Sequence, residues 1–136
     1  MARPKAKQLT ERELEIMHIF WKRQECGVAE VQADLEEQGR PLAYTTVSTL
    51  VKILLEKGFL KQVAHDRPYR FRAVRSFGEV SGRMLTDLIQ QVFGGSREAL
   101  LTRLIDPEKL SENERKLVES LLEQADDSPG KKGKRK

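Results

Sequence analysis

Four short hydroxyl side chains lie close together after Tyr44, and they are the clearest candidates for chemistry in the chain. They are Thr45, Thr46, Ser48 and Thr49. Near the start of a helix such side chains suit the DNA major groove, because longer ones hold the backbone away from the base edges. Tyr44 suits a flanking phosphate, and Lys52 suits a phosphate further along the groove. The alternative is a tolerated exposed surface, but threonine and serine are mediocre helix formers, so stability alone does not favour the cluster.

A basic hairpin is predicted directly after this helix. Residues 60–63 and 69–73 have the two-residue period of strands, and residues 65–68 suit a turn. Between Lys52 and Arg75 the sequence has seven Lys or Arg against two acids. Arg67 lies at the predicted tip, and Arg70 and Arg72 on the outer side, where they could contact a minor groove or the DNA backbone. The alternative is a solvated strand whose arginines prevent edge-to-edge pairing.

Three predicted helices must position these side chains. The first follows a capping box at residues 10–13 and runs to about Lys22. The second covers about residues 28–38, before Gly39. The third covers residues 44–57 and is followed by Gly58, with Val47, Leu50, Val51, Leu54 and Leu55 facing inward. Three helices and a hairpin predict a winged helix-turn-helix, in a fold that is mainly α with a small β-hairpin.

A second helical region is predicted after Ser76. Three amphipathic helices are expected, with apolar stripes on residues 77–93, 100–105 and 117–122, and the region is too short to bury all three stripes by itself. The same region of a second copy could cover them, and folding back on the first lobe is the alternative. The residues expected to form this homodimer interface are Leu85, Leu88, Val92, Phe93, Leu100, Leu101, Leu104, Leu117 and Leu121. Two recognition helices about 34 Å apart would then read an inverted repeat in double-stranded DNA.

Charge divides the chain in the same way. Residues 1–75 carry 14 basic and 10 acidic residues, residues 76–125 carry 6 and 9, and residues 126–136 carry 5 and 2. We therefore predict a flexible basic arm (1–8), a DNA-binding domain (9–75), a helical dimerisation region (76–125) and a disordered basic tail (126–136). The function of the basic tail is open.

Several classes of protein are disfavoured by composition. Cys26 is the single cysteine, and the two histidines, His18 and His65, are isolated, so we expect no metal site, cofactor or disulfide. No nucleophile is placed beside a base, so we expect no enzyme. No apolar run approaches the roughly 18 residues of a membrane span, and no leader opens the chain. A cytoplasmic protein without membrane contact is expected.

Five stretches of the chain also resemble a known family. They are LTERELEIMHIFWK, VAEVQADLEEQG, PLAYTTVSTLVKILLEKGFL, RPYRFRAV and SENERKLVESLLEQ. Over about residues 9–124 they resemble the penicillinase-repressor family of BlaI/MecI-type regulators. The resemblance implies a homodimeric winged-helix repressor that binds an inverted-repeat operator of β-lactam-resistance or other stress genes. It gives the recognition role to Thr45, Thr46, Ser48, Thr49 and Lys52, and the wing role to Arg67.

The chain departs from the family at two places. In β-lactam-responsive members a sensor pathway leads to cleavage of an Asn-Phe bond, and the matching position here is Arg103-Leu104. Whether a sensor-linked protease is a partner is therefore open, as are the operator, the target genes and the inducing signal. Copper-responsive relatives have a cysteine-rich C-terminal site, whereas this chain ends in GKKGKRK. A protein-interaction adaptor with an unused recognition face is the alternative function.

Overall fold

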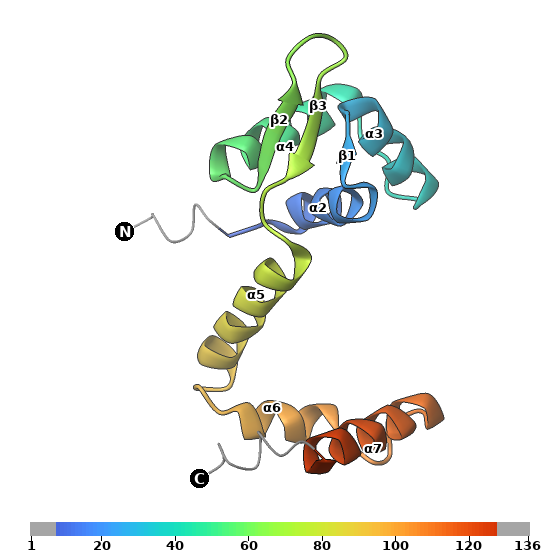
Figure 1. The fold of residues 1–136 in the computed structure, drawn as a ribbon, viewed down its shortest axis with the longest axis vertical. Helices are drawn as coiled ribbons and strands as arrows, with labels where there is room; N and C mark the ends of the chain where they lie inside the picture. The colour runs from blue at the N-terminus through green and yellow to red at the C-terminus, as the bar shows by residue number, and fades with distance from the viewer. Residues whose placement is uncertain (1–7, 128–136) are drawn as a thin grey trace. The chain divides into compact units, whose positions relative to one another are not determined.

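The computed structural model describes residues 8–127, which form two compact units that divide between Met84 and Leu85. Its elements are α2 (Glu11–Arg23), β1 (Glu25–Cys26), α3 (Val28–Glu37), α4 (Tyr44–Lys57), β2 (Leu60–Ala64), β3 (Arg70–Ala73), α5 (Phe77–Val92), α6 (Arg97–Leu104) and α7 (Glu112–Asp127). Within the described residues these are six helices and one three-stranded sheet (Figure 1). The predicted fold, a winged helix-turn-helix followed by a helical region, is confirmed.

The capping box predicted before α2 is present. The Thr10 hydroxyl accepts from the Glu13 amide at 3.1 Å, and the Glu13 carboxylate accepts from the Thr10 amide at 3.0 Å. Glu13 is buried, and its carboxylate also pairs with the Lys57 ammonium at 2.8 Å. Because Lys57 lies in the last turn of α4, this ion pair joins the start of α2 to the end of the predicted recognition helix.

The core of the first unit lies among α2, α3, α4 and the sheet. The largest fully buried side chains are Phe20, Ile16, Met17, Leu35, Leu54, Val31, Val47, Val51 and Cys26. On α4, Val47, Val51 and Leu54 are buried as predicted, whereas Leu50 and Leu55 are half-buried at the edge of the core. Burial of each large side chain contributes about 1.5–3 kcal/mol, so the apolar face of α4 holds its other face outward.

The sheet has one strand more than the sequence predicted. Its order is β1-β3-β2 with antiparallel neighbours, so β3 lies between the two others (Figure 1). β1 has only two residues, too few for a period to be recognised, and Cys26 pairs there with Phe71. The predicted hairpin is otherwise present, with a register irregularity between Gln62 and Ala64.

The start of α5 is attached to the first unit. The Trp21 indole donates to the Arg75 carbonyl at 2.9 Å, and its ring lies 5.2 Å from that of Phe77 in an edge-to-face arrangement. Val80, one turn later, is buried in the core. The sequence placed a domain boundary at residue 75, whereas the compact units divide after Met84, because this first part of α5 packs with the winged helix.

The second unit contains the end of α5, with α6 and α7. Gly94 and Gly95 follow α5 with positive φ values of 61° and 87°, a conformation that favours glycine. The Ser96 hydroxyl accepts from the Ala99 amide at 3.0 Å and so caps the start of α6. A second capping box precedes α7: the Ser111 hydroxyl accepts from the Glu114 amide at 3.1 Å, and the Glu114 carboxylate accepts from the Ser111 amide at 2.9 Å.

The chain ends differ in one respect from expectation. α7 continues to Asp127, into the segment predicted as a tail, while the predicted basic arm and tail otherwise lie outside the described residues, apart from Gln8. Within residues 8–127, no helix has the length and apolar character needed to cross a bilayer.

Candidate nucleic-acid interface

One face of α4 presents the predicted contact residues to solvent. Thr45, Thr46, Thr49 and Lys52 are exposed, and Tyr44 is 53% exposed at the first position of the helix. Ser48 is half-buried, so its hydroxyl is less accessible than the other three. The structure therefore brings these six residues onto one helix and keeps five of them open to a partner.

The start of α4 lacks the side-chain cap that α2 and α6 have. Its N-cap residue is Ala43, which offers no side-chain oxygen to the first-turn amides. These amides carry the partial positive charge of the helix and favour an anion such as a DNA phosphate. The loop before them is held by Gln32 of α3, whose side-chain amide donates to the Leu42 carbonyl at 3.2 Å.

The predicted wing tip is exposed. The Arg67 side chain lies over the Tyr69 ring, with its Cζ atom 5.6 Å from the ring centroid. Arg67 is exposed, and Tyr69 is 42% exposed. The sequence prediction did not include Tyr69, because its aromatic ring was counted only as part of the strand pattern.

Arg70 is the site residue whose surroundings differ most from expectation. Its Nε donates to Glu25 Oε2 at 3.1 Å, its Nη2 donates to the Glu25 carbonyl at 3.1 Å, and its Nη1 donates to Glu30 Oε1 at 3.3 Å. The hydrogen bond to Glu25 raises the pKa of Arg70. The strand pattern predicted an outward, unpaired cation at Arg70, whereas its guanidinium is paired with two acids. The unrecognised strand β1 carries one of them. A contact between Arg70 and DNA stays a prediction.

Ion pairs also reduce the available positive charge of the segment from Lys52 to Arg75. Lys57 pairs with Glu13, and Arg75 pairs with Glu79 at 3.1 Å. Within residues 8–127, the basic side chains of this segment that form no ion pair are Lys52, Lys61, Arg67 and Arg72, which are exposed. The cations open to a polyanion thus lie on α4, on both strands of the hairpin and at its tip.

The residues predicted for dimerisation are open to solvent in the single chain. Leu85, Leu88 and Val92 of α5 are 48%, 41% and 64% exposed, and Phe93 is half-buried. Four more are 52–62% exposed and Leu100 is half-buried; the four are Leu101, Leu104, Leu117 and Leu121. Ile105 and Leu122, which belong to the same predicted apolar stripes, are exposed at 39% and 61%. No side chain described between residues 85 and 125 is buried.

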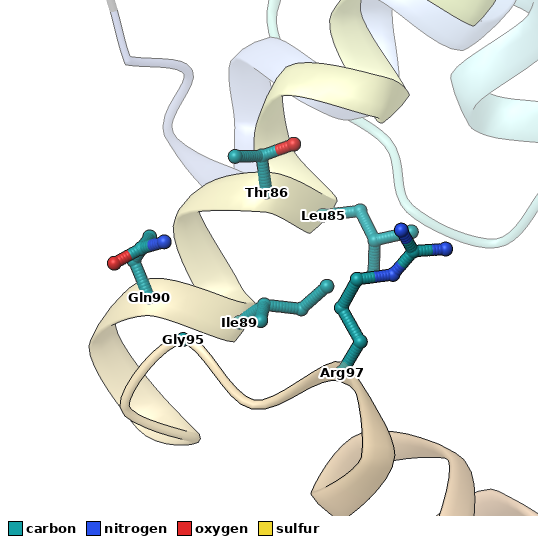
Figure 2. Close-up of a pocket in the computed structure, with 6 residues that line it drawn as sticks. All are labelled: Leu85, Thr86, Ile89, Gln90, Gly95 and Arg97. Atoms are coloured by element: carbon teal, nitrogen blue, oxygen red, sulfur yellow. The ribbon is translucent and has the colours of Figure 1, made fainter. Parts of the chain in front are cut away.

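A shallow open pocket lies within the second unit. It is lined by Leu85, Thr86, Ile89, Gln90, Gly95 and Arg97 and has a volume of about 310 Å³ (Figure 2). Its only charged group is the Arg97 guanidinium, and Leu85 is also a predicted dimer residue. One cation without an acid or nucleophile beside it provides no acid–base chemistry.

Metal-binding groups are not clustered in the described part of the chain. Between residues 8 and 127, no three His, Cys, Asp or Glu side chains lie close enough to hold a metal ion. Cys26 is buried, and burial raises the pKa of its thiol to about 11. A thiol with such a pKa is a weak nucleophile near neutral pH.

Comparison with known proteins agrees with this geometry. The family model described as "Penicillinase repressor" matches residues 9–124. The transcriptional regulator BlaI of Mycobacterium tuberculosis is 32% identical over 103 residues, covering 75% of each chain. The methicillin resistance regulatory protein MecI of Mammaliicoccus sciuri is 20% identical over 118 residues, covering 87% of this chain and 95% of MecI.

A solved structure was also found to be similar. The reduced form of MarR from E. coli aligns with 86% of this chain and 77% of that chain, at 12% identity and a TM-score of 0.43. The match to the family model over residues 9–124 and the 32% identity to BlaI establish the family without this structure. The chain belongs to the penicillinase repressor family of transcriptional regulators.

Proposed function

We propose that this protein is a homodimeric, sequence-specific repressor that binds an inverted-repeat operator in the cytoplasm. The single observation that carries the proposal is the division of α4. Val47, Val51 and Leu54 are buried, while Thr45, Thr46 and Thr49 are exposed. In a family of transcriptional regulators, such a helix suits the major groove.

The predicted contact residues have complementary partners in DNA. The hydroxyls of Thr46 and Thr49 can bond base edges, and their methyl groups can contact a thymine methyl. Tyr44 and Lys52 suit phosphates, and Arg67 suits the adjacent minor groove or backbone. Contacts to phosphate would set affinity and register, while the threonines would carry sequence specificity.

Dimerisation is supported by the exposed apolar side chains of the second unit. Leu88, Leu117 and Leu121 are 41%, 57% and 53% exposed on two amphipathic helices, α5 and α7. A second copy can cover them with the same residues, because a twofold interface is self-complementary. Two copies would also read two half-sites, which gives a small domain enough contacts for specificity.

Selection from a random library of DNA duplexes tests the proposal. We expect the wild-type chain to enrich an inverted repeat with half-site centres about one helical turn apart. Thr46→Ala and Thr49→Ala should each weaken binding to that duplex by about 1–3 kcal/mol per lost base contact, with little change on random DNA.

Thr102→Ala is a matched control. Thr102 is an exposed threonine of α6 whose hydroxyl donates to the Glu98 carbonyl at 2.9 Å. It should leave binding to both duplexes unchanged. If Thr46→Ala and Thr49→Ala lowered the affinity for selected and random DNA equally, these threonines would not be reading bases. Failure of the wild-type chain to bind any duplex would favour a protein-interaction adaptor instead.

A further inference from the structure

The Arg70 side chain connects three elements of the winged helix. From β3 it contacts the Glu25 side chain and carbonyl on β1, and Glu30 in the first turn of α3, all at 3.1–3.3 Å. The Arg70 side chain is 36% exposed, and those of Glu25 and Glu30 are 46% and 39% exposed. A planar guanidinium donates from three nitrogens and can reach three separate acceptors, whereas an ammonium donates from a single nitrogen.

Glu30 fixes one end of this connection. Its Oε1 atom also accepts from the Gly27 amide at 2.7 Å, a bond that caps the start of α3. Arg23 lies 3.9 Å from Glu30 and is itself bonded to Asp34 at 2.7 and 2.9 Å. The carboxylate that receives Arg70 is therefore held in place by its own helix.

Tyr69, the residue just before the strand β3, packs directly on the start of α3. A Cβ atom at Gly27 would come within 2.8 Å of the Tyr69 carbonyl oxygen, so only glycine permits this approach. The Tyr69 ring in turn supports the Arg67 guanidinium at 5.6 Å. The exposed Arg67 is thus fixed through Tyr69 and Arg70.

We infer that Arg70 is a positioning residue of the wing, which holds the Arg67–Tyr69 tip toward DNA and does not itself bind phosphate. The inference rests on the proposed DNA-binding function. If Arg70 moved to a phosphate, Glu25 and Glu30 would lose their cation and lie uncompensated near the DNA backbone. Repulsion between carboxylates and phosphates disfavours that exchange.

The salt dependence of DNA binding by the full chain distinguishes positioning from phosphate contact. Affinity is measured at several salt concentrations on the selected duplex and on a random-sequence duplex. Arg67→Gln should lower the slope of log affinity against log salt by about 0.9, the value for one phosphate contact. Arg70→Gln should leave the slope unchanged while weakening binding to the selected duplex by at least about threefold.

Two further variants sharpen the test. Arg70→Lys keeps the charge but not the three contacts, so it should weaken binding like Arg70→Gln, whereas a phosphate-binding residue would tolerate lysine. Glu25→Ala removes a negative charge and should nevertheless weaken binding, because Arg70 loses a partner. Glu37→Ala, at an exposed position at the end of α3, makes the same change of charge as a control and should not weaken binding.

Each remaining outcome overturns the inference. A lower slope for Arg70→Gln, full binding by Arg70→Lys, or tighter binding by Glu25→Ala would make Arg70 a phosphate contact. An unchanged slope for Arg67→Gln would leave no tip contact to position. Circular dichroism identifies any Arg70 variant that does not fold, and Glu25→Ala then decides by the sign of its effect. If the wild-type chain binds no DNA, the proposed function fails first.

Discussion

The two units of this chain treat the same kind of apolar pattern differently. The first has a core of fourteen buried apolar side chains, whereas no side chain described between residues 85 and 125 is buried. α5 belongs to both units: Val80 is buried, while Leu88 and Val92 are 41% and 64% exposed. A periodic apolar stripe therefore indicates that a helix face must be covered, but not which surface covers it. The sheet and three helices cover such faces in the first unit, and we propose that a second copy does so in the other.

The largest expected effect tests the self-contained core. Phe20 is fully buried, and Phe20→Ala should destabilise the first unit by about 3–5 kcal/mol, because the lost apolar contacts leave a cavity. Chemical denaturation followed by circular dichroism measures this loss. It should be independent of protein concentration. Val92→Ala, at a 64% exposed position, is the comparison and should not change the stability of the first unit.

The second unit should respond to protein concentration. Leu121→Asp places a charge on its exposed apolar surface and should weaken self-association by about 2 kcal/mol or more, because a charge is costly to bury. Sedimentation measurements should find a dimer for the wild-type chain and a monomer for the variant at the same concentration. Ser120→Asp, one residue away and exposed, is the matched control and should stay dimeric. A wild-type chain that stays monomeric at high concentration would contradict the proposed interface.

The two capping boxes allow a matched comparison of the units. Thr10→Ala and Ser111→Ala remove equivalent hydrogen bonds of 3.1 Å, each worth about 1 kcal/mol. The first loss should lower unfolding stability at every protein concentration. The second should also weaken dimerisation, because α7 has no core of its own to hold it. Equal, concentration-independent losses from both substitutions would show that the units do not differ in this way.

Acid should produce the smallest effect, and it should lie in the first unit. The hydrogen bond from Arg23 lowers the pKa of Asp34, and the hydrogen bond from Arg40 lowers the pKa of Glu15. A carboxyl whose pKa is lowered by folding adds stability above its unfolded pKa, and that stability is lost as the pH falls through the folded pKa. Stability should therefore decrease below about pH 4.5, and Asp34→Asn should make the decrease shallower. Solvent screening keeps the change small, and denaturation midpoints at several pH values measure it.

The helices of the first unit and their ends could be predicted from the sequence. The helices of the first unit, their caps at Thr10 and Gly58, and the buried positions of α4 follow from residue spacing. The strand β1 could not be predicted, since two residues carry no period. The pairing of Arg70 could not be predicted for the same reason, because alternation along β3 gives the side of the strand but not the acid on the neighbouring strand.

For the site residues, the sequence could predict the type of side chain and the helix face, but not the contacts with neighbouring segments. The hydroxyl face of α4 was identified because its spacing differs from that of the core. The role of Tyr69 beside Arg67 needed the structure, as the contact crosses a turn whose geometry the residue types do not specify. The half-buried position of Ser48 likewise depends on neighbours from other segments.

The attachment of α5 provides a built-in optical reporter. The chain has one tryptophan, and Trp21 is the residue whose indole bonds to Arg75 and packs against Phe77. Its fluorescence emission therefore reports on a single location, where the linker between β3 and α5 meets the start of α5. Release of that linker would expose the indole to water and shift the emission to longer wavelength, without any added dye. Whether the linker moves when the protein engages or leaves its target can thus be followed in real time with the unmodified chain.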